Sequence, residues 1–195
     1  MLKRFFDIIF SLLVLFFSFP IILIVSLFIK IDSPGPIIFK QKRIGHRGEI
    51  FTILKLRTMR QEEGPLLTTS EDIRITCVGR FLRRTNFDEL PQFFNIVKGE
   101  MSVVGPRPEI PEVVGKFTDE QREILNFKPG FTSYATVKSL KEEKILKNKD
   151  LMNQYFNEQL PLKIKLDLYY FRYKSNFFND IGIILKTIGR TFYAW

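Results

Sequence analysis

Two adjacent acids and an arginine between prolines are the residues of this chain best suited to chemistry. Asp88 and Glu89 precede Pro91, a residue that fits the first turn of a helix. The prolines of Gly105-Pro106-Arg107-Pro108 fix φ around Arg107 and stiffen its backbone. Carboxylates near a rigidly presented guanidinium suit phosphate chemistry. The same acids also suit a helix cap, and Arg107 a surface turn, so the pattern alone leaves both interpretations open.

A helix is predicted directly after the two acids. Leu90, Phe93, Phe94 and Val97 recur at helical spacing, which predicts an apolar face turned inward, and Gly99 is expected to end the helix. Adjacent residues of a helix diverge by about 100°. The two acids at its start are therefore expected to play distinct roles rather than to share one proton.

The exact strings around these residues resemble one enzyme family. They are Asp88-Glu89-Leu90-Pro91-Gln92, Asn95, Lys98-Gly99-Glu100-Met101-Ser102 and Gly105-Pro106-Arg107-Pro108, preceded by Lys55-Leu56-Arg57-Thr58-Met59 and followed by Lys128-Pro129-Gly130. In this order, and behind an apolar N-terminus, they resemble the monotopic phosphoglycosyl transferases of the bacterial sugar transferase family. Members transfer a phosphosugar from a nucleotide diphosphate sugar to a polyprenol phosphate, normally undecaprenyl phosphate, as the first membrane step of glycoconjugate biosynthesis.

The resemblance implies a role for each matching residue. Asp88 would be the nucleophile that attacks the β-phosphorus of a UDP-sugar and expels UMP, and Glu89 would be a ligand to Mg²⁺. The metal and nearby cations would neutralise the diphosphate so that a carboxylate can approach it. The further positions that match family site residues are Lys55, Arg83, Arg107, Asp167 and Asp180. The last two match late acidic positions and are expected among the substrate-binding residues, although the resemblance gives neither a particular contact.

The chain departs from the family pattern after Lys128-Pro129-Gly130. Many relatives carry an Asn-Gly-Arg-Asn motif whose arginine helps to bind the nucleotide sugar, and Leu140 stands at that position here. We expect Lys138 or Lys141 to supply the missing charge. The sugar itself does not follow from the resemblance.

Composition narrows the class of protein. The chain has 195 residues, and its 21 phenylalanines are many for a soluble protein of this size. Its net charge of +9 suits anionic substrates, anionic lipid headgroups or nucleic acid. Its single cysteine, Cys77, excludes an internal disulfide, and its single histidine, His46, excludes a histidine-based metal site or triad. No nucleic-acid motif occurs, so nucleic acid is not an expected partner. The resemblance implies a UDP-sugar, undecaprenyl phosphate and membrane lipids as partners, and oligomerisation is left open. The alternatives are an inactive scaffold of the same family or a membrane-tethered basic binding protein.

A membrane anchor is predicted at the N-terminus. Residues 8–29 carry no charge, and a helix of this length reaches about 33 Å, enough to cross a bilayer core. However, basic residues flank both ends (Lys3 and Arg4 before, Lys30 after), and Pro20 lies near the middle. Sequence physics leaves a spanning and a re-entrant helix equally open. The resemblance favours a re-entrant helix broken near Ser18 and Pro20, on the cytoplasmic face of the bacterial inner membrane.

The expected fold class is α+β and mostly helical, with a re-entrant anchor over residues 1–31 and a cytoplasmic-face catalytic domain over residues 32–195. Strands over 37–41 and 49–56 are expected to form a small β-hairpin, with Lys55 and Arg57 on one face. These two side chains could both point at a phosphate or could protect a solvated strand edge, and the resemblance favours the first for Lys55. Helices are expected over 73–84, 118–126 (begun by a capping box of Thr118 and Gln121) and 141–155. Amphipathic helices over 161–173 and 181–192 would lie in the membrane interface around the compact catalytic core.

Overall fold

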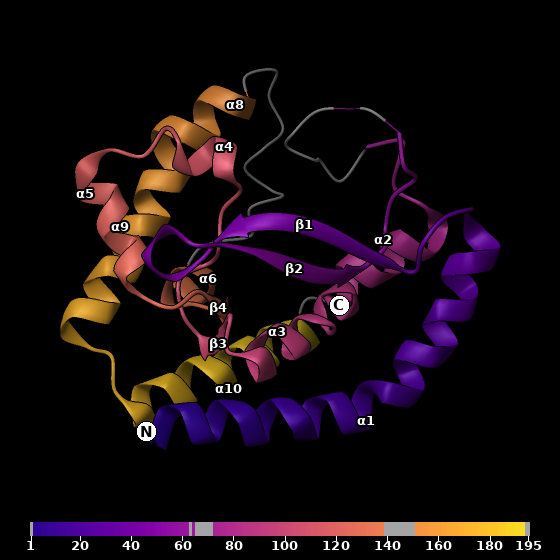
Figure 1. The fold of residues 1–195 in the computed structure, drawn as a ribbon, viewed down its shortest axis with the longest axis horizontal. Helices are drawn as coiled ribbons and strands as arrows, with labels where there is room; N and C mark the ends of the chain where they lie inside the picture. Colours follow the sequence, from indigo (N-terminus) through magenta and orange to yellow (C-terminus); the bar gives the residue numbers. More distant parts are fainter. Residues whose placement is uncertain (1, 63, 65–71, 139–150, 194–195) are drawn as a thin grey trace.

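The computed structural model describes residues 2–62, 64, 72–138 and 151–193, and within them helices surround a central β-hairpin (Figure 1). The chain order is α1, β1, β2, α2, α3, β3, α4, α5, β4, α6, α8, α9 and α10, with short 3-10 and π turns between some of them. The predicted class, mostly helical with a small sheet, is therefore confirmed. The predicted helix over 141–155 lies largely outside the described residues.

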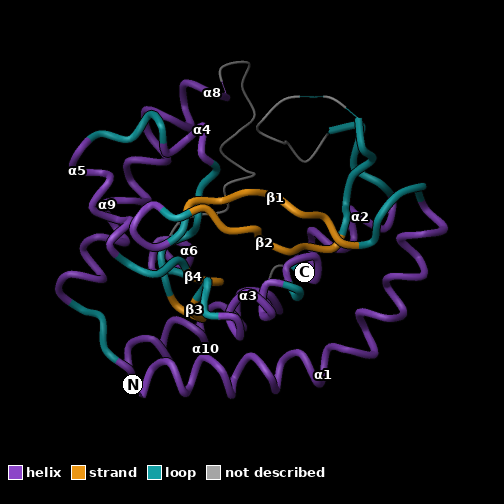
Figure 2. The backbone as a smooth tube through the Cα atoms, viewed as in Figure 1, coloured by secondary structure: helices purple, strands orange, loops and turns teal. Residues whose placement is uncertain are grey.

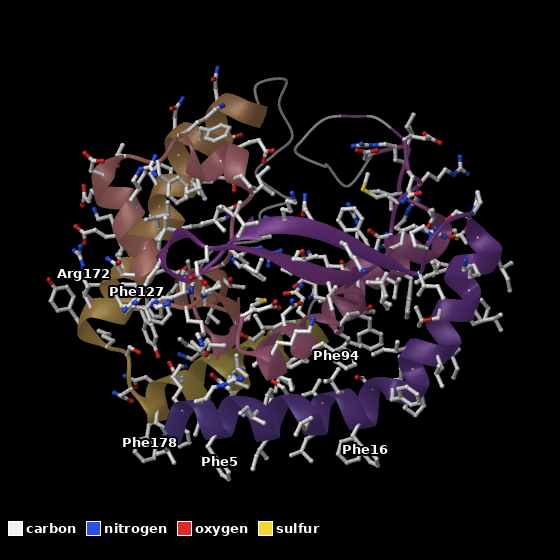
Figure 3. All side chains as sticks on the ribbon, viewed as in Figure 1. Phe5, Phe16, Phe94, Phe127, Arg172 and Phe178 are labelled. Atoms are coloured by element: carbon white, nitrogen blue, oxygen red, sulfur yellow. The ribbon has the colours of Figure 1, made fainter. Side chains whose placement is uncertain are left out.

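The N-terminal helix α1 (Leu2–Asp32) lies along one edge of the molecule and then bends toward the far end of the hairpin (Figure 1). Pro20 lies inside it, and a proline bends a helix because it lacks the backbone N–H and its ring clashes with the preceding turn. Among the described residues, α1 is the one helix long and apolar enough to cross a membrane. Figure 3 shows Phe5 and Phe16 of α1 and Phe178 of α10 on the same outer edge.

The predicted hairpin is present, from β1 (Ile38–Ile44), which ends three residues beyond the predicted strand, and β2 (Ile50–Leu56), which ends where predicted. The strands are antiparallel, with Ile38 opposite Leu56 and Ile44 opposite Ile50. A 3-10 turn (His46–Gly48) joins them, in which Gly48 adopts a φ of 83° that only glycine tolerates easily. His46 is thus a turn residue.

The two acids lie on a 3-10 turn (Phe87–Glu89), between α2 (Cys77–Thr85) and α3 (Gln92–Lys98), rather than at the start of the α-helix itself. Asn86, in the left-handed region at φ 55°, separates this turn from α2. Helix α2 begins at Cys77 instead of residue 73, because the Thr76 hydroxyl accepts from the Gly79 N–H and caps it. Gly99, at φ 94°, ends α3 as predicted.

The inward face of α3 is narrower than predicted. Phe93 is 4% exposed and Ile96 is completely buried, whereas Phe94 is 49% exposed. Neighbouring residues on a helix point about 100° apart, so Phe93 and Phe94 cannot both face the core.

A second, parallel sheet of two strands was not predicted. It pairs β3 (Ser102–Val104) with β4 (Gly130–Thr132), placing Ser102 opposite Gly130 and Val104 opposite Thr132. A Cβ on Gly130 would lie 2.0 Å from the Gly105 nitrogen, so the backbones of the two motifs touch. The sheet thereby joins Gly105-Pro106-Arg107-Pro108 to Lys128-Pro129-Gly130.

The remaining helices pack around one end of the hairpin and beneath it (Figure 2). The predicted capping box of Thr118 and Gln121 is present and begins α5. The elements are α4 (Pro111–Val114), α5 (Asp119–Arg122) with a 3-10 turn (Glu123–Asn126), α6 (Tyr134–Lys138), α8 (Leu151–Gln154) with a π turn (Tyr155–Gln159), α9 (Leu160–Tyr173) and α10 (Phe177–Tyr193).

Candidate active site

Two cations converge on one oxygen of Glu89. Lys55 Nζ, from β2, donates to Glu89 Oε1 at 2.6 Å, and Arg107 Nη2, from the loop after β3, donates to the same oxygen at 3.0 Å. Burial raises the pKa of Glu89, but the charges of Arg107 and Lys55 and their hydrogen bonds outweigh it and hold the pKa well below its usual range. Glu89 is therefore an ionised carboxylate at the centre of a cationic cluster.

Asp88, its neighbour, is buried in a different way. Its carboxylate makes no hydrogen bond within the described part of the chain. Burial and the charge of Glu89 raise the pKa of Asp88 to about 6, against the opposing charges of Lys55, Arg83 and Arg107. A carboxylate with few partners and a raised pKa is a better nucleophile or base than a paired one. The two acids thus differ in environment, as expected for groups with distinct roles.

The structure brings four of the sequence-predicted site residues close to Asp88. Lys55 and Arg107 meet at Glu89, while Arg83, from α2, donates to the Thr58 hydroxyl at 3.0 Å. All three cations lower the pKa of Asp88 by their charge. An anionic diphosphate is the kind of ligand that such a cluster accommodates.

Arg43, which the sequence did not single out, positions the arginine loop. Its guanidinium donates to the Pro108 carbonyl at 3.0 Å and lies 3.7 Å from Glu109 Oε2. Burial lowers the pKa of Arg43, and the charge of Glu109 opposes that effect. The hairpin therefore holds the Gly105-Pro106-Arg107-Pro108 segment from one side, while β4 holds it from the other.

Asn95 ties the acid-bearing segment to the hairpin and is completely buried. Its Oδ1 accepts from the Leu54 N–H at 3.1 Å, and its Nδ2 donates to the Thr52 carbonyl at 2.7 Å and to Glu100 Oε2 at 2.6 Å. These bonds fix α3 against β2 and hence Glu89 against Lys55. Asn95 belongs to the quoted motif, but its role became apparent only from these contacts.

Arg57 does not point at the acid pair, contrary to the prediction. It donates to the carbonyls of Ile29, Ser33 and Pro34 at 3.1, 2.6 and 2.9 Å, at the end of α1. Strand β2 ends at Leu56, so the alternation that would place Arg57 beside Lys55 does not extend to it. Arg57 instead satisfies the carbonyls of Ser33 and Pro34, which follow the last turn of α1, and shares the Ile29 carbonyl with the Ser33 N–H.

Two polar side chains, Arg4 and Asp7, hold the first turns of α1. Arg4 donates to the carbonyls of Ile96 and Val97 at 2.6 and 2.8 Å, and buried Asp7 accepts from Ser102 Oγ at 2.8 Å and from the Val103 N–H at 3.1 Å. Asp7 is the one acid between Lys3 and Lys30, a signal that could have identified it.

Asp180 also contacts the start of α1. It pairs with Lys3 and accepts from the Tyr170 hydroxyl at 2.7 Å. These contacts connect α10 with α1 and α9, and the structure does not bring Asp180 to the Glu89 cluster.

Asp167 is buried at a small cavity that Arg107 also lines. The cavity volume of about 40 Å³ leaves room for a few waters at most. Asp167 Oδ1 accepts from the Ala135 N–H at 2.7 Å, and burial raises its pKa to about 7. Lys138 is exposed and its Nζ lies 5.9 Å from the ring centroid of Tyr134, while Leu140 and Lys141 lie outside the described residues.

The donor set near Asp88 suits Mg²⁺. This ion usually binds one or two carboxylates together with substrate phosphates and water, rather than a cage of protein ligands. The hydrogen bonds from Lys55 and Arg107 both go to Oε1 of Glu89 and not to its Oε2, and Asp88 is the preceding residue. No group of three or more acids, histidines or cysteines suited to a metal occurs among the described residues. The residues present therefore fit a substrate-assisted Mg²⁺ site.

Comparison with known proteins decides the family. The family model described as bacterial sugar transferase matches residues 1–194. This chain belongs to the bacterial sugar transferase family. The match includes α1 as well as the Asp88–Glu89 turn and the arginine loop, so the whole described fold belongs to the family unit.

Curated relatives share this unit. The chain is 44% identical over 134 residues, 67% of its length and 71% of the relative's, to the "Putative undecaprenyl-phosphate N-acetylgalactosaminyl 1-phosphate transferase" of Bacillus subtilis (strain 168). It is 35% identical over 202 residues, 98% of its length but 40% of the relative's, to the "UDP-glucose:undecaprenyl-phosphate glucose-1-phosphate transferase" of Escherichia coli (strain K12). It is 34% identical over 197 residues, 96% of its length and 43% of the relative's, to the "UDP-N-acetylgalactosamine-undecaprenyl-phosphate N-acetylgalactosaminephosphotransferase" of Aeromonas hydrophila. The chain therefore spans less than half the length of the last two.

Proposed function

We propose that this transferase moves a sugar 1-phosphate from a UDP-sugar to undecaprenyl phosphate, giving undecaprenyl diphosphosugar and UMP. The observation that carries the proposal is the ionised Glu89 paired with Lys55 and Arg107 beside the buried carboxylate of Asp88, whose pKa is raised. The names of the relatives, which specify undecaprenyl phosphate and in two cases a UDP-sugar, support the same reaction. An inactive scaffold or a basic binding protein would have no use for such a pair of acids.

In the first step, a carboxylate oxygen of Asp88 attacks the β-phosphorus of the UDP-sugar. The bond between that phosphorus and the bridging oxygen breaks, and UMP leaves with the bridging oxygen. The sugar phosphate remains on Asp88 as an acyl phosphate. Lys55, Arg83 and Arg107 reduce the repulsion between the carboxylate and the diphosphate, and they stabilise the charge that develops on the leaving group.

In the second step, a phosphate oxygen of undecaprenyl phosphate attacks the same phosphorus. The bond from Asp88 to phosphorus breaks, the carboxylate is restored, and the new diphosphate bond links lipid and sugar. Glu89 would hold Mg²⁺, which when bound neutralises phosphate charge. With Glu89 ionised below its usual pKa, it is ready to bind a cation throughout the neutral range.

The covalent step is tested by Asp88→Asn. Radiolabelled UDP-sugar should place label from the sugar on the peptide that contains Asp88 in the unaltered protein, and the variant should show neither label nor UMP release. Asp119→Asn, the same chemical change at an exposed position of α5, is the matched control and should behave as the unaltered protein. Normal turnover by Asp88→Asn would rule out the covalent mechanism.

The metal is tested separately. Glu89→Gln should weaken the dependence of activity on Mg²⁺ concentration, because an amide is a poorer ligand for a hard cation. Activity that is unchanged by EDTA in the unaltered protein would remove Mg²⁺ from the mechanism.

We also propose that α1 is re-entrant and that the catalytic domain lies on the cytoplasmic face of the inner membrane. Support comes from the contacts at its two ends, because Arg4 and Asp7 near the start and Asp32 at the end all bond to the same catalytic domain. Val25 and Ile29 pack with Leu56 and Leu82. A helix whose two ends contact one domain returns to the side from which it entered.

Cysteine accessibility tests this topology. Cys77 is exposed and would be replaced by serine, and Leu2→Cys and Pro36→Cys would be made singly in that background. In intact cells both should resist an impermeant thiol reagent, and both should react after permeabilisation. Labelling of Leu2→Cys in intact cells would mean that α1 crosses the membrane.

A further inference from the structure

An open apolar groove lies between α1 and the turn that carries the two acids. One wall is formed by α1 between Phe10 and Ile21, and the other by Phe87 and Leu90. Its volume of about 370 Å³ falls in the range of about 300–1,000 Å³ that is usual for small-ligand sites. Apart from Ser18, the side chains that line it are apolar, so it suits a hydrocarbon and not a sugar or nucleotide.

The position of the groove specifies its occupant. Phe87 immediately precedes Asp88, and Leu90 immediately follows Glu89, so the apolar wall and the acid pair are parts of the same short turn. Glu89, between these two apolar residues in the chain, pairs with the cationic groups of Lys55 and Arg107. A hydrocarbon site that adjoins a cationic site fits an amphiphile with an anionic head and an apolar tail.

We propose that this groove holds the isoprenyl units nearest the phosphate of the lipid acceptor and directs that phosphate toward Asp88. The proposal rests on the proposed function, because the acceptor in that reaction is a polyprenyl phosphate. It adds the subsite between α1 and the Phe87–Leu90 segment, and it makes α1 part of the acceptor site as well as an anchor.

Orientation, more than affinity, is the expected contribution. The tail of the acceptor is already in hydrocarbon before it binds, so its transfer to an apolar groove brings little hydrophobic gain. Contact with Phe87 and Leu90 instead fixes where the phosphate emerges relative to the phosphorylated Asp88, and attack requires that geometry. A change in the groove should therefore impair the second half-reaction and leave the first, which uses only the donor, in operation.

The chain offers a matched pair of variants. Leu13 lines the groove and Leu12 does not, yet their exposures are nearly equal, 52% and 51%. Leu13→Trp places a large ring in the groove, whereas Leu12→Trp makes the same change on the neighbouring surface of α1. Both proteins would be reconstituted in nanodiscs and assayed with undecaprenyl phosphate. We expect Leu13→Trp to raise the KM for the acceptor about tenfold, the equivalent of about 1.4 kcal/mol, and Leu12→Trp to leave it unchanged.

A second pair of variants tests the groove without adding a bulky tryptophan, which could prevent folding. Phe17 lines the groove and Phe16 does not, with exposures of 72% and 74%. Phe17→Ala enlarges the groove and should also raise the KM for the acceptor, while Phe16→Ala should not. In all four variants the donor-dependent labelling of Asp88 should persist, which shows that each protein is folded.

The outcomes separate this proposal from the proposed function. Equal KM values for the acceptor within both pairs, with Asp88 still labelled, would mean that the groove holds only bilayer lipid, and the proposal would be wrong. Absence of labelled Asp88 in the unaltered protein would overturn the proposed function itself. Loss of labelling in the groove variants alone would assign the groove to the donor and would also overturn the proposal.

Discussion

Replacement of Asp167 by asparagine should stabilise the protein at alkaline pH and not at acidic pH. Asp167 is 4% exposed, and burial raises its pKa to about 7 from the model-compound value of 3.8. Hydrogen bonds from Ala135 and Ser133 and the charge of Lys163 lower the pKa but do not cancel the effect of burial. At a pH between these two pKa values, Asp167 keeps its proton in the folded protein but has released it in the unfolded chain.

The difference between these two pKa values sets the direction and the size of the change in stability. Because the unfolded state binds fewer protons in this window, the free energy of unfolding falls as pH rises from about 4 to about 7. About three pH units at about 1.36 kcal/mol each amount to a penalty of about 4 kcal/mol at pH 8. Asparagine avoids the penalty but forms a weaker hydrogen bond, at a cost of about 1 kcal/mol. The net gain is about 3 kcal/mol at pH 8, and at pH 4.5 the two effects cancel.

Thermal unfolding in detergent measures the effect. At about 2–4 °C per kcal/mol for a domain of this size, Asp167→Asn should raise Tm by about 6–12 °C at pH 8 and by almost nothing at pH 4.5. Asp119→Asn, on the exposed surface, should change Tm little at either pH. The same shift for Asp167→Asn at both pH values, or a lower Tm at pH 8, would show that the carboxyl is not held neutral. Loss of activity despite higher stability would support the substrate-binding role that the resemblance implies.

Three further predictions concern contacts around the site. Gly130→Ala should destabilise the protein by about 3 kcal/mol, because its Cβ would lie 2.0 Å from the Gly105 nitrogen, and thermal unfolding would show this against Gly182→Ala, whose Cβ meets nothing within 4 Å. Asn95→Ala should lower the free energy of unfolding by about 3 kcal/mol, since it leaves the Leu54 N–H, the Thr52 carbonyl and Glu100 without their partner; an equal Tm would contradict this. Replacement of Lys138 and Lys141 together by alanine should raise the KM for the nucleotide sugar about tenfold, with a smaller effect on the KM for the lipid; unchanged kinetics would mean that the donor is bound without these lysines.

The sequence by itself determined the family, the acid pair and the local elements. The hairpin, the end of α3 at Gly99 and the capping box of Thr118 and Gln121 were predictable, because each depends on residues a few positions apart. A segment from residue 8 to residue 29 without charge likewise predicted the long apolar helix. The predicted apolar face of α3 was too wide, because helical spacing cannot tell which of Phe93 and Phe94 faces the core.

Only the tertiary structure decided how the site is held. The pairs Lys55–Glu89 and Arg107–Glu89 join residues 34 and 18 positions apart, and Asp7 reaches Ser102 across 95 positions. Arg57 caps the end of α1 instead of facing the acids, and β3 pairs with β4 through strands of three residues. Such contacts form between surfaces that meet only when the chain is folded, and no short-range pattern encodes them. The different environments of Asp88 and Glu89 have the same origin, because burial and the charges of Lys55 and Arg107 act on the pKa values of both acids, and Glu89 and Arg83 also act on that of Asp88.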